Sequence, residues 1–568
     1  MTRWVLILLF LGTSAAWSDV PLARLHGLDN AQLESGLRDI LGNSSAETGD
    51  EIAMRRDLRT ARDRALRYLR AQGFYAVTIE AEIGGDGRPE LEIATGPRFS
   101  FGTVATEAID PQARAVAAAA IGELEGEDLT AQIVLDAEAR GLAALRNNGW
   151  PEADSGARQV IVDHARAAGD VTFRYLPGAF TRFGGVVLQS DGWRDTFIQR
   201  LAGLDAGEPA RAETVELYRQ RLDGLSSVAN SEVRFGLAED GTRPLFVTLE
   251  AAPKHAIEAT LSLSTADGAG VSTAWSRRNL YGGDETLTLT AEIATLSQSL
   301  TADLSFPYWR RLDQRMELGA GLKSEDTDAY QQDEINASID VYRKLEDDLD
   351  LRLGAIYDFS RVTDATGERD IHSLRFNSAL ALDQRDDPLD PRSGVHAAIL
   401  LNPGVSFGDA EATYLQAEAR ASTYYSFNEH LTAAARARIG TIIGASATDL
   451  PADQRFYAGG GGSARGFEYQ SLSPVGSDGA PFGGLSVTEL NAELRWRGEG
   501  RWGAVAFVDT AFAGANRSPD FDDLRTGFGI GLRYYFDFAP VRLDLATPLD
   551  RRSGEDPLHV YISIGQAF

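Results

Sequence analysis

The chain contains no cysteine and no long run of apolar residues. None of its 568 residues is Cys, which excludes thiol catalysis, thiolate metal sites and disulfide frameworks. Beyond the N-terminus, no segment approaches the ~18 apolar residues that a membrane-spanning helix requires. If the protein lies in a membrane, we therefore expect a closed β-barrel, in which every backbone polar group is paired.

Basic residues and catalytic motifs are also scarce. Lys and Arg number 55 against 83 Asp and Glu, a formal charge of −28. Nucleic-acid binders need a basic surplus to displace counterions from phosphates, so we expect no nucleic-acid partner. The seven His residues show no metal-ligand spacing, and the glycines at 459–462 lack the Lys-Ser/Thr of a phosphate loop. We expect no catalytic, cofactor-binding or metal-binding residue, and interpret the protein as a non-enzyme.

The N-terminus has the pattern of a secretory signal peptide. Arg3 supplies positive charge, residues 4–11 form a short apolar core, and small residues follow. The alternative is a membrane anchor, but this apolar run is too short to cross about 30 Å of hydrocarbon. The sequence predicts a signal peptide at residues 1–18, cleaved after Ala16 or Ser18, and hence an exported protein.

The next part of the chain combines helical and strand patterns. Apolar residues within 59–70 are spaced for one helical face, and Gly73 fits a helix C-cap. Alternating segments at 77–83 and 90–93 follow, separated by a glycine-rich turn. This order predicts a helix packed on a β-hairpin.

The same order recurs twice. The helical segments end at Gly73, Gly149 and Gly224, which are 76 (149 − 73) and 75 (224 − 149) residues apart. Fixed-period self-similarity indicates repeated domains. The sequence predicts three α+β repeats of two helices and three strands each, at residues 19–97, 98–173 and 174–252. Two roles stay open: the sheet edges accept an extended peptide by β-augmentation, or the repeats are only spacers.

From residue 253 onward the pattern is that of an all-β protein. Polar and apolar residues alternate at 286–293 and 541–545, which suits a strand with one face toward lipid and one toward a wet lumen. Aromatic residues cluster near expected strand ends, as in interface girdles, at 306–309, 424–425 and 534–536. We therefore predict a transmembrane β-barrel at residues 253–568, in preference to a soluble β-sandwich or propeller.

Two motifs resemble those of a known family. Residues 454–467, QRFYAGGGGSARGF, resemble the sixth-extracellular-loop signature of the superfamily of POTRA-plus-barrel proteins that includes BamA, TamA and the two-partner-secretion transporters. Residues 506–509, AFVD, resemble the next barrel motif of that superfamily. The resemblance implies three POTRA-type α+β repeats in the periplasm and a barrel of sixteen antiparallel strands in the outer membrane, in contact with its lipid.

The resemblance also implies an interaction inside the barrel. The loop folds back into the lumen, where Arg465 meets Asp509. An arginine and a carboxylate in a restricted lumen can form a bidentate pair. Gly466 permits backbone conformations that a Cβ forbids, and Phe467 would wedge the loop tip against the wall. The alternative is a flexible outer loop with a solvated arginine.

Further segments extend the resemblance over nearly the whole mature chain. Residues 278–283 resemble the turn after the first barrel strand, 383–394 resemble the D-x-R-D-x-P-x-x-P turn, and 527–533 resemble a penultimate-strand motif. The chain departs from the family at Ala464, often a β-branched residue, and at Gln566, usually an apolar one.

The number of repeats distinguishes branches of this superfamily. Three repeats resemble the TamA branch, the outer-membrane subunit of the translocation and assembly module. That resemblance implies a TamB-like partner, anchored in the inner membrane and engaging the first repeat, and outer-membrane clients such as autotransporters. The alternatives are a two-partner-secretion transporter, which needs two repeats, and a passive structural barrel without clients.

Edge physics suggests how such a barrel could act on clients. Closure removes unpaired strand edges, so weak pairing between the first and last strands would leave a seam. We expect the first strand to run from about Ala256 to Ser264 and the last from Val560 to Phe568. Gly565, which has no side chain to pack, is compatible with weak pairing at that seam.

Overall fold

The computed structural model describes residues 22–43, 51–85, 88–238, 241–264, 268–519, 521–536 and 540–564. The predicted signal peptide lies outside these ranges, as do Gly565 and Phe568. Within the described ranges, no helix is long and apolar enough to span a membrane. The chain divides into two compact units, one of residues 1–185, 204–217 and 235–245, the other of residues 186–203, 218–234 and 246–568.

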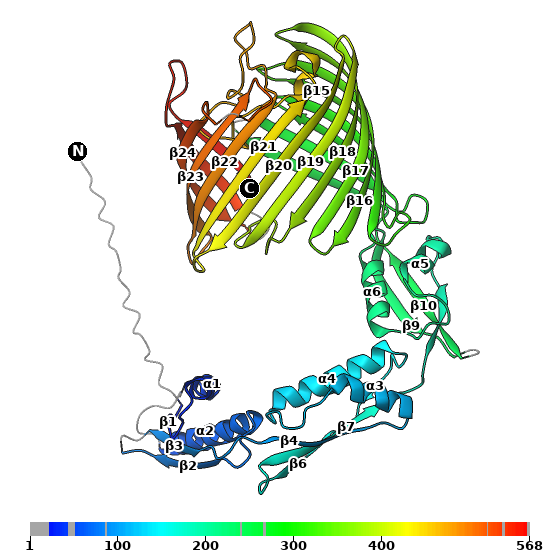
Figure 1. Cartoon of the computed structure of the whole chain (residues 1–568), viewed down its shortest axis with the longest axis vertical. Helices are drawn as coiled ribbons and strands as arrows, with labels where there is room; N and C mark the ends of the chain where they lie inside the picture. The colour runs from blue at the N-terminus through cyan, green and yellow to red at the C-terminus, as the bar shows by residue number, and fades with distance from the viewer. Residues whose placement is uncertain are drawn as a thin grey trace, which may run out of the picture. The chain divides into compact units, whose positions relative to one another are not determined.

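The first repeat packs two helices on a three-stranded sheet of order β1-β3-β2 (Figure 1). Its elements are β1 (Arg24–His26), α1 (Ala31–Leu41), α2 (Glu51–Ala71), β2 (Thr78–Ile83) and β3 (Pro89–Ala94). Ala61, Ala65 and Leu69 on α2 are fully buried with Leu91 of β3. These positions follow the helical spacing read from the sequence, so the apolar face of α2 forms the core.

The second repeat also has two helices, but its sheet has four strands rather than the predicted three. Its elements are β4 (Ser100–Glu107), α3 (Pro111–Ile121), α4 (Ala131–Asn147), β5 (Asp154–Ser155), β6 (Gln159–Asp163) and β7 (Ala168–Leu176). Trp150, Phe173 and Tyr175 are buried at its centre. The boundary placed at residue 173 is wrong: β7 continues to Leu176, and its last two residues, Tyr175 and Leu176, pair with β5.

The third repeat forms a sheet of order β8-β10-β9. Its elements are β8 (Arg182–Leu188), α5 (Asp195–Leu201), α6 (Ala212–Asp223), β9 (Val228–Phe235) and β10 (Thr242–Ala251). Gly73 and Gly149 adopt positive φ after their helices, whereas Gly224 does not. The prediction of three α+β repeats is confirmed, although the three glycines do not share one backbone conformation.

The remaining strands form one sixteen-stranded antiparallel sheet in which sequence neighbours pair, as predicted (Figure 1). The strands are β11 (His255–Ser264), β12 (Gly268–Arg277), β13 (Thr286–Ala294), β14 (Ser297–Phe306), β15 (Gln314–Asp326), β16 (Gln331–Glu346), β17 (Leu349–Asp364), β18 (Gly367–Asp383), β19 (Gly394–Gly408), β20 (Ala412–Ser426), β21 (Leu431–Ile443), β22 (Ser486–Arg497), β23 (Trp502–Gly514), β24 (Arg525–Tyr535), β25 (Pro540–Pro548) and β26 (His559–Ile564). The segment at 527–533 lies on β24, third from the end, which corrects its assignment to the penultimate strand.

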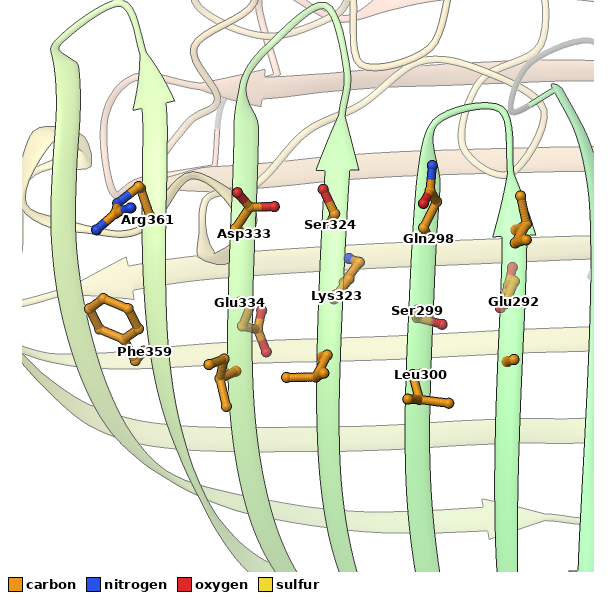
Figure 2. A pocket seen from close by; sticks show the side chains of 14 residues that line it. Glu292, Gln298, Ser299, Leu300, Lys323, Ser324, Asp333, Glu334, Phe359 and Arg361 are labelled. Carbon is orange, nitrogen blue, oxygen red and sulfur yellow. The ribbon is translucent and has the colours of Figure 1, made fainter.

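Side chains of the barrel wall alternate between lipid and lumen. Leu289 and Leu300 are 39% and 51% exposed on the outer face, whereas Asp303 lies on the opposite face of the same strand as Leu300. Figure 2 shows a groove of about 500 Å³ in the outer wall, where this apolar band ends. Toward the strand ends a row of polar side chains replaces it, formed by Gln298, Ser324, Asp333 and Arg361.

The two rims of the barrel differ. We call the rim where β11 begins the proximal rim and the opposite one the distal rim. The three predicted aromatic clusters all lie at the ends of strands that run toward the proximal rim, namely β14, β20 and β24. The distal rim carries a long connection between β21 and β22, residues 444–485, which includes the short helices η1 (Ala447–Asp449) and η2 (Ala452–Gln454).

Candidate functional site: a loop anchored in the barrel lumen

The connection at residues 444–485, here called the lumen loop, packs against the inner wall of the barrel. Ala464 and Phe467 are 0% and 3% exposed, and they cluster with Val487 of β22 and Ala511 of β23. The same cluster contains further loop residues, so the loop buries an apolar core of its own. A flexible, solvated outer loop is therefore not what the chain forms.

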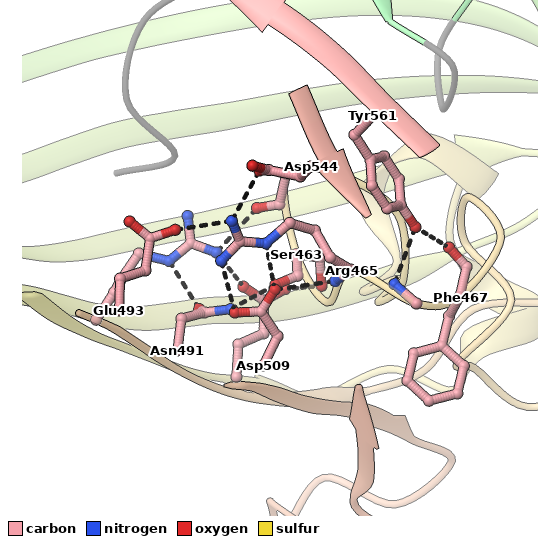
Figure 3. A network of polar contacts seen from close by, with 12 residues as sticks. Ser463, Arg465, Phe467, Asn491, Glu493, Asp509, Asp544 and Tyr561 are labelled. Atoms are coloured by element: carbon pink, nitrogen blue, oxygen red, sulfur yellow. Dashed lines mark hydrogen bonds and ion pairs between the residues drawn. The ribbon is translucent and has the colours of Figure 1, made fainter. Parts of the chain in front are cut away.

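Arg465 is held by Asp509 from the neighbouring wall (Figure 3). Its Nε donates to Asp509 Oδ2 at 2.6 Å and its Nη2 donates to Oδ1 at 3.0 Å. The backbone N–H of Arg465 donates to the same carboxylate at 3.1 Å. The guanidinium also lies over the ring of Phe507, 3.5 Å from its centroid. The structure thus brings together the two residues that the resemblance paired, in bidentate geometry.

Two more carboxylates complete the environment of Arg465. Its Nη1 lies 3.0 Å from Asp544 Oδ2 and 2.7 Å from Glu493 Oε1. Arg533 pairs with Asp544, and Arg495 with Glu493. Three strands therefore supply the three carboxylates, and neighbouring arginines balance their charge. Burying so many charges is unfavourable unless each is paired, so this cluster is stable only with Arg465 in place.

The electrostatic balance at Arg465 follows from these contacts. Burial alone lowers the pKa of its guanidinium, but hydrogen bonding and Coulomb attraction from Asp509, followed by Glu493 and Asp544, raise it by more. The net pKa of Arg465 lies above its usual range. Arg465 is therefore a permanent cation and acts as a fixed anchor.

The loop tip passes close to the wall because glycine lies on both sides of the contact. Gly466 has φ of +98°, which disfavours any side chain there. A Cβ on Gly527 of β24 would lie 2.0 Å from the Arg465 carbonyl oxygen. The N–H of Gly466 donates to the Tyr561 hydroxyl at 3.0 Å, and that hydroxyl donates to the Phe467 carbonyl at 2.9 Å. Tyr561 thereby joins the last strand to the loop.

A second anchor holds the beginning of the loop to the opposite part of the wall. Arg455 Nη2 donates to Asp364 Oδ2 of β17 at 2.6 Å, and both side chains are fully buried. Arg455 also stacks on Phe482, 4.1 Å from the ring centroid. Gln454 accepts from Tyr414 and donates to Ser373. The loop is thus fixed near both ends of its signature motif.

Asp453, beside this second anchor, is a half-buried residue whose Oδ1 is itself buried and has no hydrogen-bond partner among the described residues. Burial raises its pKa to about 6, with Glu334 and Asp358 adding to the shift and Arg375 and Lys323 opposing it. The carboxyl is therefore more easily protonated in the folded loop than in an unfolded chain.

The predicted seam residues lie at the two ends of the sheet. Ala256 and Ser264 belong to β11 and Val560 belongs to β26, whereas Gly565 and Phe568 lie outside the described residues. Cα atoms of β11 and β26 approach within 8 Å. Over the parts of the two strands that the structure describes, no hydrogen-bonded ladder joins them.

Sequence reasoning found Arg465 and Asp509 through motifs and missed the residues around them. Glu493, Asp544 and Tyr561 converge from different strands, and no local pattern marks them. Arg455 lies within the recognised motif, but its partner Asp364 is 91 residues away. Charged residues at lumen-facing positions of successive strands are the one sequence signal that could have identified the carboxylates.

No metal site is formed by the residues that the structure describes: none of their His, Asp or Glu groups is arranged to hold an ion.

A family model described as the Omp85 superfamily domain matches residues 279–568, which are 290 (568 − 279 + 1) of the 568 residues. The match therefore covers just over half of the chain.

One solved structure has the same fold, and two others match less well. BamA from Haemophilus ducreyi lacking POTRA domains 1–3 superposes with a TM-score of 0.69 at 15% identity, covering 82% of this chain and 99% of that one. CdiB from Acinetobacter baumannii gives a TM-score of 0.48 at 14% identity, covering 82% of this chain and 89% of that one. CdiB from Escherichia coli gives 0.47 at 13%, covering 92% and 99%. The BamA likeness establishes a shared fold.

Replacing Asp509 by Asn should release the tip of the lumen loop. Arg465 would keep Asp544 and Glu493 but lose its bidentate partner, at a cost of about 3 kcal/mol. Trypsin should then cleave after Arg465 many times faster in the folded barrel. The matched control is Asp370→Asn, which breaks a bidentate but exposed pair with Arg361 and should cost little, because water screens exposed ion pairs. Equal protection of Arg465 in both variants would contradict the anchor.

The loop should be held more firmly in mild acid than at neutral pH. The folded pKa of Asp453, about 6, lies above the unfolded value of about 4. Its contribution is therefore fully present below about pH 4 and is lost as pH rises through about 6, by at most roughly 3 kcal/mol. Trypsin accessibility of the loop, or unfolding of the barrel, is measured across this pH window in wild type and in Asp453→Asn. Only the wild type should lose stability as the pH rises. If the variant has the same pH profile as the wild type, the pH dependence belongs to other groups.

Proposed function

Because this chain belongs to the Omp85 superfamily, we propose that it inserts β-rich client proteins, such as autotransporters, into the outer membrane. Members of the superfamily sit in the outer membrane and act on client outer-membrane proteins. In this proposal the repeats extend into the periplasm and the barrel offers a strand edge to the client. The role matches the TamA branch, and it assigns no chemical step to the chain.

The pairing of the last strand is the observation that carries this proposal. β26 forms a ladder with β25 from His559 to Ile564, but no ladder with β11 in the parts of both strands that the structure describes. On its lumen side, Tyr561 hydrogen-bonds to the loop tip at Gly466 and Phe467. An unpaired edge is a template for another strand, so a client strand could pair with β26 or β11.

The anchored lumen loop holds the last strand in position at the seam. Arg465 ties the loop to three strands near the end of the sheet, and Tyr561 ties the loop to β26. The last strand therefore keeps its place on the lumen side even when its outer edge is exchanged. Opening of the seam would need β11 to move away, while the charged cluster stays intact.

The alternative of a two-partner-secretion transporter makes a different demand on the loop. An exoprotein crossing the lumen would require the loop to leave it. That movement would expose the carboxylates Glu493, Asp509 and Asp544 without their shared cation, which is strongly unfavourable in a buried site. The three repeats also differ from the two that such transporters carry. A passive barrel, the other alternative, would have no client.

A covalent lock across the seam should abolish client assembly. The chain has no native cysteine, so an engineered disulfide would be the only one. One cysteine is placed on β11 and one on β26, and the pair of positions that crosslinks most completely is used. Because the disulfide keeps a client strand from pairing with β11 or β26, membrane insertion of an autotransporter should fall to background. It should recover when the disulfide is reduced.

The matched control is a lock inside the sheet. Ser276 and Thr288 are paired across β12 and β13, with hydroxyl oxygens 3.2 Å apart, so Ser276→Cys with Thr288→Cys closes a ladder that is already formed. Client assembly should be unaffected by this disulfide. Full activity of the oxidised seam lock would refute the proposal that a client strand pairs at the seam.

A crosslinker in the first repeat should capture the periplasmic partner. Glu80 is exposed on β2, the edge strand of the first sheet. A photocrosslinking residue there should yield an adduct with a large, TamB-like protein anchored in the inner membrane, identified by mass spectrometry. The same residue at Glu92, on the central strand β3, is the control. Capture of a secreted exoprotein alone would favour the two-partner-secretion alternative.

A further inference from the structure

A pocket at the proximal rim lies between α5 of the third repeat and two turns of the barrel. It has a volume of about 390 Å³ and is formed by α5 together with the β12–β13 and β14–β15 turns of the barrel. Residues 186–203 and the barrel belong to one compact unit, so all the lining residues are part of the same body.

One wall of the pocket is fixed by two buried carboxylates. Asp284 accepts hydrogen bonds from the N–H groups of Ser226 and Ser227, at 2.9 and 2.8 Å. Glu285 accepts from Arg194 at 2.6 Å and from the N–H of Gly283 at 2.9 Å. The Glu285 pair neutralises Arg194 and holds the start of α5 against the barrel turn, whereas Asp284 holds the segment before β9 to the same turn.

The other two arginines of the pocket have no such partner. Arg200 lies over Phe197, 5.8 Å from the ring centroid, and Arg310 lies over Trp309 at 4.5 Å. Neither guanidinium has a hydrogen bond or ion pair within the described part of the chain. Two uncompensated cations in one pocket are notable in a protein with a formal charge of −28. Their charge calls for an anionic ligand.

The position of the pocket indicates where that anion comes from. Phe306 lines the pocket and ends β14, whose outer face carries Leu300 and Leu304 toward the lipid. The pocket therefore lies where the apolar band meets the proximal rim. Trp side chains such as Trp309 favour this level of a membrane, where lipid headgroups are found.

The backbone around Trp309 is held in an unfavourable conformation. Tyr308 and Arg310 both have positive φ, +51° and +61°, which is uncommon for residues with bulky side chains. Asn279 and Asp284 in the neighbouring turn share this feature. Such strain is retained where the surroundings determine it and is concentrated at ligand-binding and functional sites.

We propose that this pocket binds the phosphate of an anionic phospholipid from the membrane leaflet at the proximal rim. Arg200 and Arg310 donate to the phosphate oxygens, and Trp309 and Phe306 contact the glycerol and the first methylenes of the acyl chains. A bound lipid would join α5 to the barrel turns and so stiffen the third repeat at the membrane surface.

The proposal is tested with full-length protein in a neutral detergent, titrated with dihexanoyl phosphatidylglycerol, dihexanoyl phosphatidylcholine or inorganic phosphate. Binding is followed by native mass spectrometry. We expect phosphatidylglycerol to bind most tightly, and the double variant Arg200→Gln with Arg310→Gln to weaken it by at least about tenfold, since charge-assisted hydrogen bonds contribute that much or more. The choline lipid should be affected much less.

The control is Arg551→Gln, which removes an exposed arginine from the β25–β26 turn at the distal rim and should leave phosphatidylglycerol binding unchanged. Because Arg200 and Arg310 are exposed and hold no ion pair with the described residues, their replacement should leave the barrel folded, which heat-modifiable gel mobility verifies. Unchanged affinity in the double variant would overturn the site. Equal binding of the choline lipid would overturn the role of charge, and equal binding of inorganic phosphate would overturn the lipid as its source.

Discussion

The burial of Arg465 among three carboxylates is the interaction on which the barrel interior depends. Asp509, Glu493 and Asp544 come from three different strands. Without the arginine, Asp509 would lose its ion-pair partner among the described residues, and Glu493 and Asp544 would each keep only one arginine, Arg495 and Arg533. Removing the cation would cost far more than the pair contributes over a neutral packing. The cluster therefore specifies a position for the loop rather than merely adding stability, and it brings the loop to the strands next to the seam.

The second anchor, at Arg455, fixes the lumen loop to the wall at a second place. Arg455 and Arg465 are ten residues apart in the loop (465 − 455), yet they pair with acids on opposite parts of the wall, Asp364 on β17 and Asp509 on β23. The loop between them contributes its own apolar core. Its position is thus determined by side-chain charge at both ends and by packing between them.

Few polar contacts hold the seam between β11 and β26, and few hold the third repeat to the proximal rim of the barrel. At the seam, a single tyrosine links the last strand to the loop where a ladder to the first strand is absent from the described residues. At the proximal rim, Glu285 fixes α5 of the third repeat to a barrel turn through Arg194, and Asp284 fixes the segment before β9 to the same turn. Both arrangements leave one partner site open: a strand edge in the first case and a cationic pocket in the second.

The sequence determined the architecture because local patterns report local structure. Apolar spacing on α2 and alternation along strands such as β13 and β25 follow from the 3.6- and 2-residue periods of helix and strand, and the glycine period revealed the repeats. The ends of elements were less certain, as the extension of β7 past residue 173 shows, because alternation does not state where pairing stops.

The candidate site was only half accessible to sequence. The loop motif and its acidic partner were recognisable as short segments, so Arg465 and Asp509 could be paired from resemblance. Tyr561, Asp544 and Asp364 could not, because each acts through a contact across the lumen with a residue far away in the chain. The sequence by itself determined three repeats and an alternating all-β half, while the family resemblance supplied the sixteen strands and the pairing of Arg465 with Asp509. Only the tertiary structure decided which charges surround that arginine, since barrel closure and register, rather than local spacing, bring them together.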